Sequence, residues 1–306
     1  MINGRAGLLF RETGKICLLK PMRIHLHLSA FAPPCILGLA LVSLSAVNTQ
    51  AAFTVFEATG VDPAGVIPTR DAFRVAVGGG AVAGANGSFG GLRREINWDG
   101  VPNAAADPNL LPANFFNVNS PRGVVFSTPG TGFLVSANAG QAAPVLFGFP
   151  SDFQTFSAQR LFTALGSSVT DVSFFLPGTA TPAVTTAFGL IFTDVEVADF
   201  TMVQFFDQNN TLLFSRSALT GGNQGLTFLG AVATAGESIG RVRITSGGNS
   251  LVANGVLGNP NDDVVVMDDF LYAEPTLVPE ASGFVLPGLG LTAMIMVRYL
   301  RWRKRV

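Results

Sequence analysis

The chain has 306 residues with 20 acidic and 19 basic side chains, but residues 52–277 hold 18 of the acids, nine arginines and no histidine, cysteine or lysine. Within that region this composition excludes a catalytic triad with a histidine base, histidine-bound zinc and Schiff-base chemistry, and leaves carboxylate chemistry as the main catalytic route. The net charge of −9 over the same residues disfavours nucleic acid and anionic membrane surfaces as partners.

The first 51 residues are typical of an export signal. Met22-Arg23-Ile24-His25 precedes an apolar run from Ile36 to Ala46, and Thr49-Gln50-Ala51 supplies small residues suited to cleavage. Both cysteines lie in this segment. We therefore expect residues 1–51 to form a signal helix with an N-terminal extension, and we expect an exported region without disulfide bonds.

Residues 52–277 are expected to form one all-β ectodomain, a β-sandwich or a jelly-roll-like fold. Short runs rich in Val, Phe, Ile and Thr alternate with clusters of Gly, Pro, Asn and Asp, which is typical of strands joined by turns. No stretch between the two ends of the chain shows a sustained helical period. The predicted strands are Asp71–Val77, Gly123–Ser127, Gly132–Ser136, Asp171–Leu176, Ala187–Val195, Thr201–Asp207, Thr211–Arg216, Gly225–Val232, Ile239–Ser246 and Val264–Tyr272.

Two segments do not fit the strand pattern. Gly78–Gly91 is rich in Gly and Ala and is expected to be a loop. Val101–Pro121 is rich in Pro, Asn and Asp, and it is either a binding loop or a coil packed by its apolar residues. The packed coil is favoured, because Leu111 and Phe116 are among four large apolar residues there that gain free energy from burial.

The only compact group that resembles a sugar-binding site is Glu95, Trp98 and Asp99. An aromatic platform beside two acids is typical of carbohydrate recognition, and the two carboxylates would serve as a glycosidase pair only if the fold set them ~5–9.5 Å apart across a cleft. The alternative is a core tryptophan flanked by surface ion pairs with Arg93 and Arg94.

Asp268–Asp269 ends an apolar strand, where neighbouring side chains point to opposite faces. One carboxylate would then face inward, and a buried carboxylate needs a partner. The pattern is consistent with a calcium site made with Asp194 or Glu196. The alternatives are ion pairs with Arg241 or Arg243, or hydrogen bonds to neighbouring backbone.

A second acidic pair, Asp262–Asp263, lies beside Asn259 and Asn261. Carboxylate and amide oxygens are ligands that calcium accepts, so this group would suit an ion. A solvated acidic loop is the favoured interpretation, and no stretch has EF-hand spacing.

The C-terminus combines a short motif, an apolar segment and a basic cluster. Val278-Pro279-Glu280-Ala281-Ser282 precedes apolar residues 283–297. An apolar segment with basic residues after it stops transfer across a membrane and leaves the basic end in the cytoplasm. The basic residues are Arg298, Arg301, Arg303, Lys304 and Arg305.

This order of features resembles the PEP-CTERM sorting signal of exopolysaccharide-producing bacteria, with Ala281 where that signal usually has a second proline. The resemblance implies a transmembrane helix within residues 278–306, cleavage near the motif by an exosortase-like enzyme, and delivery to the envelope or extracellular matrix. The alternative is a plain C-terminal membrane anchor.

The ectodomain also resembles an uncharacterised family of secreted bacterial proteins, a resemblance that implies no activity. More weakly, the Asp-Asp-Phe strand ending is similar to that of jelly-roll carbohydrate-binding modules. We expect a non-enzymatic structural or adhesive protein in exopolysaccharide, with weak carbohydrate binding and a carboxylate-only glycoside hydrolase as alternatives. The stretches that carry the family resemblance are Arg94–Val101, Asn119–Val124, Phe188–Val195, Phe228–Ala231, Arg241–Gly247 and Val266–Phe270.

Overall fold

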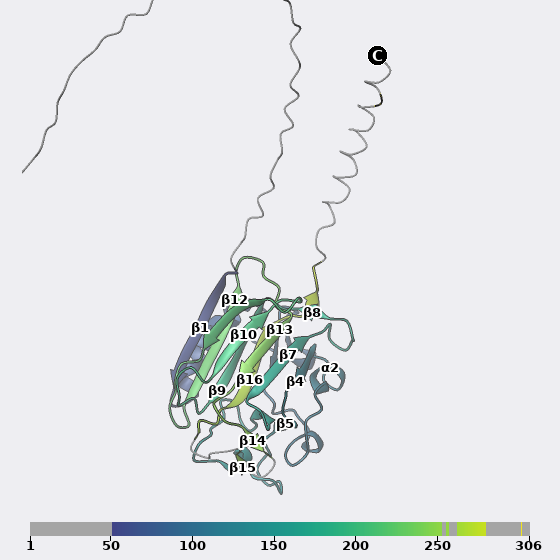
Figure 1. The fold of residues 1–306 in the computed structure, drawn as a ribbon. Coiled ribbons are helices and arrows are strands. Elements are labelled where there is room, and N and C mark those ends of the chain that lie inside the picture. The colour runs from purple at the N-terminus through teal and green to yellow at the C-terminus, as the bar shows by residue number, and fades with distance from the viewer. Residues whose placement is uncertain (1–50, 253–254, 257–261, 280–300, 302–306) are drawn as a thin grey trace, which may run out of the picture. The chain divides into compact units, whose positions relative to one another are not determined.

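The computed structural model describes residues 51–252, 255–256, 262–279 and 301 (Figure 1). No helix within these residues is long and apolar enough to span a membrane. The predicted signal helix and C-terminal membrane helix lie outside the described residues, as do Glu280, Ala281 and Ser282 of the motif and, in the basic cluster, Arg298, Arg303, Lys304 and Arg305.

The described region is mostly β, as predicted. Its strands are β1 (Phe53–Gly60), β2 (Ser88–Phe89), β3 (Arg93–Ile96), β4 (Val124–Ser127), β5 (Gly132–Val135), β6 (Phe162–Leu165), β7 (Val169–Phe174), β8 (Ala183–Val184), β9 (Ala187–Thr193), β10 (Met202–Phe206), β11 (Leu212–Ser217), β12 (Leu226–Ala233), β13 (Arg241–Thr245), β14 (Leu251–Val252), β15 (Gly255–Val256), β16 (Val266–Ala273) and β17 (Thr276–Leu277). Its helices are α1 (Pro63–Val77), α2 (Phe115–Val118) and the short 3-10 turns Ala85–Gly87, Asn103–Ala105 and Leu146–Gly148.

These strands form two main sheets. In the first, the order is β1-β12-β9-β16-β6-β14-β15, with β3 added beside β16, β2 beside β3 and β5 beside β6. The second has the order β11-β10-β13-β7-β4, and β17 pairs with β8 in a separate ribbon. Strands β6, β7, β9 and β10 alternate between the two main sheets, and most neighbours within a sheet are distant in the sequence.

The two main sheets pack face to face on a phenylalanine-rich core. The Phe126 ring of β4 lies 6.2 Å from the Phe270 ring of β16, and the Phe174 ring of β7 lies 5.8 Å from the Tyr272 ring. These inward residues alternate with outward ones along each strand, as the period of two requires. The predicted packing of segment 101–121 is confirmed for Leu111, Phe115 and Phe116, which join this core, whereas Leu110 is exposed.

Helix α1 covers the outer face of the first sheet, so the strand predicted at Asp71–Val77 is wrong. Asp62 caps the helix by accepting a hydrogen bond from the Ala64 N–H at 2.9 Å, and Pro63 starts it. Phe73 packs where Gly189 of β9 pairs with Gly230 of β12. A Cβ atom at Gly230 would lie 2.9 Å from Phe73 Cδ2, so the two glycines allow the helix to approach the sheet.

The remaining predicted strands are confirmed within a few residues, and a tight turn joins β10 to β11. Asn210 adopts a φ of 62° there, and Asp207 accepts the N–H groups of Asn209 and Thr211, each at 2.8 Å. Both ends of the described domain lie at the same end of the packed sheets, where β1 begins and β17 finishes (Figure 1).

Candidate functional site

The predicted carbohydrate platform at Trp98 is not formed, because the ring is part of the core. Its side chain is 1 % exposed and stacks on Phe162 with ring centroids 4.0 Å apart and an interplanar angle of 2°. Its indole N–H donates to the Asp268 carbonyl at 2.8 Å. The alternative of a core tryptophan is therefore correct, and no face of the ring is free to stack on a sugar.

The two acids on either side of Trp98 make separate structural contacts. Glu95 accepts two hydrogen bonds from Arg74, at 2.6 and 2.8 Å, and one from Arg93 at 2.7 Å. Asp99 accepts the backbone N–H groups of Gln159 and Arg160 at 2.6 and 3.1 Å, and burial raises the pKa of its carboxyl. Nothing in this geometry pairs the two carboxylates for acid–base catalysis.

We expected Arg93 to lie at the surface, but the residue is only 1 % exposed. Besides Glu95, its guanidinium donates to the carbonyls of Arg74, Gly78 and Gly80 at the C-terminal end of α1. Gly78 and Gly80 adopt φ values of 91° and 72°, which glycine tolerates without steric cost. The glycine-rich segment thus turns its carbonyl groups toward a buried cation.

Asp268 and Asp269 occupy a bulge in β16, and their carboxyls lie on one serine. Along β9, Met267 pairs with Phe192 and Phe270 pairs with Leu190, so β16 carries one residue more than its partner strand between these pairs. The expected alternation of faces fails for this reason. The Ser157 hydroxyl lies 3.2 Å from Asp268 Oδ1 and 2.7 Å from Asp269 Oδ1.

This carboxyl pair is held by neighbouring backbone, one of the alternatives we considered. Asp268 Oδ2 accepts the N–H groups of Phe156 and Ser157 at 2.6 and 3.3 Å. Burial, together with the charge of Asp269, raises the pKa of Asp268 well above its ordinary range. The raised pKa means that Asp268 binds a proton more readily than a solvated carboxylate does.

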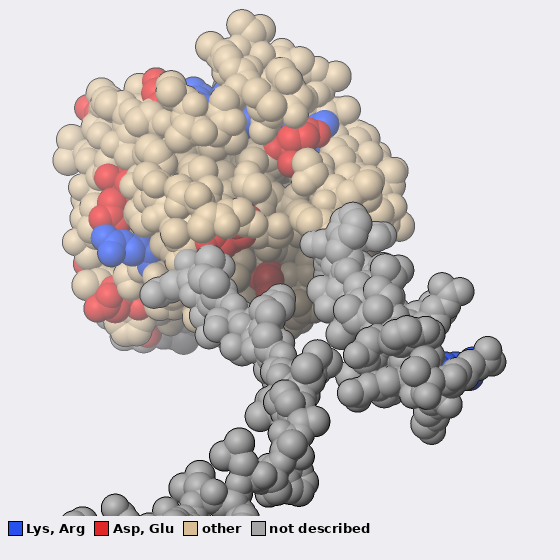
Figure 2. All heavy atoms as spheres, turned by 90° about the horizontal axis from the view of Figure 1, so that it is seen from above, with Lys and Arg blue, Asp and Glu red and all other residues tan. Residues whose placement is uncertain are grey.

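Arg241 and Arg243, the other partners considered for this pair, bind a different acid. Arg241 Nη1 lies 2.6 Å from Asp171 Oδ1, and Arg243 Nη2 lies 2.8 Å from Asp171 Oδ2. The three residues lie side by side on β13 and β7. Ion pairs of this kind are common at the surface: on the face in Figure 2, acidic and basic side chains lie next to one another in small groups.

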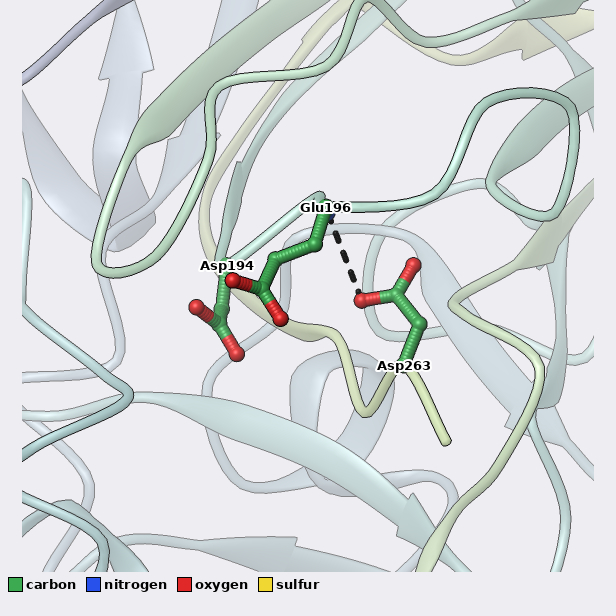
Figure 3. Close-up of side chains that lie close together, drawn as sticks. All are labelled: Asp194, Glu196 and Asp263. Carbon is green, nitrogen blue, oxygen red and sulfur yellow. Dashed lines mark hydrogen bonds between the residues drawn. The ribbon is translucent and has the colours of Figure 1, made fainter. Parts of the chain in front are cut away.

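Asp194 does not join Asp268 and Asp269 but lies beside Glu196 and Asp263. One carboxylate oxygen from each of these three residues lies within 4.8 Å of the others, and Figure 3 shows the three side chains converging. Asp263 Oδ1 and Oδ2 accept the N–H groups of Glu196 and Val197 at 3.4 and 3.2 Å. Sequence reasoning named all three acids but not their grouping, because Asp263 comes from the segment before β16.

The electrostatics of this acidic cluster favour a bound proton or cation. Burial raises the pKa of Asp194 to about 7, and the charges of Glu196, Asp152 and Asp263 add to the shift. One hydrogen bond from the Gln224 N–H at 2.9 Å opposes it. All-oxygen ligands of this kind are those that calcium accepts in proteins.

Of the predicted sorting motif, Val278 and Pro279 are described and exposed, immediately after β17. In the basic cluster, Arg301 is also exposed. No family model matches the chain, and a search of curated proteins found no match either.

Replacing Asp194 with asparagine is expected to stabilise the protein at pH 7.5 and to do so by much less at pH 5. Because the folded-state pKa is raised, the wild type loses stability as pH rises from the unfolded value near 4 through about 7, by up to ~4 kcal/mol at ~1.4 kcal/mol per unit. Asparagine cannot ionise and retains an acceptor for the Gln224 N–H. Urea denaturation at the two pH values measures the difference.

Calcium provides the control for this experiment. Calcium that binds the folded wild type at pH 7.5 should raise its stability by mass action and leave Asp194→Asn nearly unchanged. A variant that is less stable than the wild type at pH 7.5 would show that Asp194 is held as a favourable charge, contrary to this expectation.

Proposed function

We propose that this chain is a non-enzymatic exported protein of the cell envelope, outer surface or extracellular matrix, with a structural or adhesive role in exopolysaccharide. The observation that carries the proposal is the C-terminal order of motif, apolar segment and basic cluster, which resembles a PEP-CTERM signal. The signal-like first 51 residues support it. The chain is transiently anchored in the inner membrane and then processed by an exosortase-like enzyme.

The position of the motif agrees with processing by another enzyme. Thr276 and Leu277 form the last described strand, and Leu277 and Val278 are 62 % and 38 % exposed. A protease-like partner needs an accessible, extended backbone next to the bond that it cuts. The residues leading into the motif meet this condition.

The case for a non-enzymatic role rests on the chemistry that residues 52–277 lack and on how their acids are used. Without histidine or lysine, catalysis would depend on carboxylates. Glu95 is bound by two arginines and Asp99 by two backbone N–H groups. The glycoside hydrolase and the Trp98-based carbohydrate module are therefore the weaker alternatives.

The proposal includes two finer structural features. The alternation of β6, β7, β9 and β10 between two packed sheets supports a jelly-roll-like β-sandwich. A structural calcium ion just after β9 is supported by the convergence of Asp194, Glu196 and Asp263. The calcium experiment described above tests it.

The sorting proposal is tested by the intact mass and location of the mature protein in a host with and without its exosortase-like enzyme. A product that ends near Pro279–Ala281 only when the enzyme is present is the expected result. A membrane-bound product that retains Arg298–Val306 in both strains would overturn the proposal and leave a plain C-terminal anchor.

A further inference from the structure

A cavity of about 540 Å³ opens beside α1 at the outer face of the first sheet. Its walls come from α1, the glycine-rich segment that leads into β2, β3, the segment after α2, the segment before β6, and the bulge of β16. The volume is within the ~300–1,000 Å³ typical of small-molecule sites. The charged and hydroxyl-bearing residues of its lining are Arg70, Arg74, Glu95, Arg122, Ser157 and Asp269.

Two arginines on this lining have donors to spare. Arg70 uses Nε for Asp71 at 2.8 Å and lies over the Phe156 ring at 5.0 Å, but its two terminal nitrogens make no hydrogen bond to any described residue. Arg122 uses Nε for Ser120 and Nη1 for the Glu95 carbonyl, and its Nη2 makes none within the described part of the chain. Both side chains are partly buried, so these donors need an acceptor more than exposed ones do.

The same cavity is also lined by acceptors. Asp269, in the β16 bulge, lies two residues before Leu271, which pairs with Glu95 of β3, and both acids line the cavity. Ser157 donates to Asp269 Oδ1 at 2.7 Å. A bare anion would meet these carboxyls unfavourably, whereas hydroxyl groups would donate to them.

We propose that this cavity binds a ligand that carries one carboxylate and several hydroxyl groups, such as a hexuronate unit of an anionic polysaccharide or a free sugar acid. Arg70 and Arg122 bind the carboxylate, and Asp269 accepts hydrogen bonds from the hydroxyls. A neutral sugar would leave the guanidinium donors unpaired, and phosphate would place more negative charge beside the two acids.

Ligand binding in this cavity does not depend on whether the chain is sorted through its C-terminal signal. The net charge of −9 over residues 52–277 opposes the approach of any anion. Salt at 0.15 M shortens the range of that repulsion to about 8 Å, whereas contacts inside the cavity are screened much less. Binding at physiological salt is therefore expected to depend on the cavity arginines.

The test is isothermal titration of the purified full-length protein at pH 7 and 0.15 M salt with oligogalacturonate, gluconate, glucose, acetate and phosphate. Oligogalacturonate or gluconate should bind, with affinity at least tenfold above that of glucose, acetate or phosphate. Tighter binding of oligogalacturonate identifies a polysaccharide unit, and tighter binding of gluconate identifies a free sugar acid.

Variants assign the binding to the cavity. Arg70→Gln is expected to weaken it at least tenfold, and Arg70→Lys, which keeps the charge but loses the planar fork, less so. Arg216→Gln on β11 is the matched control and should leave it unchanged, since Arg216 binds Glu57 elsewhere. No binding of either sugar acid, equal binding of glucose or acetate, or folded Arg70 variants with unchanged affinity would each overturn the proposal.

Discussion

Replacement of Arg93 with alanine is expected to lower the free energy of unfolding by about 3–5 kcal/mol. The side chain is almost fully buried, and its guanidinium binds Glu95 and three carbonyl groups at the C-terminal end of α1. Alanine would leave those carbonyls and part of the largely buried Glu95 charge without this partner. Urea denaturation followed by far-UV circular dichroism measures the loss.

Arg216→Ala is the matched control for Arg93. Its ion pair with Glu57 is closely spaced, at 2.5 Å, but 47 % of the Arg216 side chain is exposed, so the expected loss is about 0–1 kcal/mol. Equal losses of unfolding free energy in Arg93→Ala and Arg216→Ala would show that burial does not determine how much Arg93 contributes to stability. In that case the glycine-rich segment would not depend on this cation.

The second large effect is expected at Trp98, where alanine should cost about 3–5 kcal/mol. The ring packs on Phe162, on Phe116 at 5.4 Å and on Phe270 at 5.1 Å between centroids, and its N–H satisfies the Asp268 carbonyl. Truncation leaves a cavity between the sheets and a buried acceptor without its donor. Chemical denaturation followed by circular dichroism gives the loss, because the variant no longer has the only tryptophan of residues 52–277 as a fluorescent probe.

Phe200→Ala serves as the comparison, since Phe200 is 53 % exposed and its truncation should change stability by less than about 0.5 kcal/mol. The result also separates a core role from a binding role. A folded Trp98→Ala protein of nearly wild-type stability that had lost glycan binding would contradict the core assignment.

The second half of the domain was predictable because its strands carry their own signal. Arg241 and Arg243 alternate with Val242 and Ile244, and the structure places the valine and isoleucine in the core and the arginines on Asp171. Here the local pattern and the global packing agree.

The sequence did not predict helix α1, because its residues favour a strand whereas its tertiary contacts stabilise a helix. Val66, Ile67, Val75 and Val77 are β-branched and favour strands, and Pro68 lies inside the helix. The helix is stabilised by burial of Val66 and Phe73 against the first sheet, which no local pattern records. The one available signal was Asp62-Pro63, a typical helix start.

The site residues show a similar limit. Two acids in an apolar strand mark Asp268 and Asp269 as unusual. Their carboxyls point the same way because β16 has one residue more than β9 at the bulge, which the sequence of β16 alone does not reveal. Ser157, which joins them, lies more than one hundred positions earlier in a segment without any pattern. The grouping of Asp194 with Asp263 likewise depends on the pairing of β9 with β16.

Strand β1 begins and β17 finishes at the same end of the packed sheets, and this determines which part of the domain would face away from an anchor. A protein held through the residues after Pro279 would have its acidic cluster beyond the far end of β9, roughly 20 Å from the attachment point at 3.3 Å per residue. That is more than two Debye lengths at physiological salt. The cluster would therefore respond to the ion concentration of the surrounding medium and would be insulated from the surface potential of the membrane.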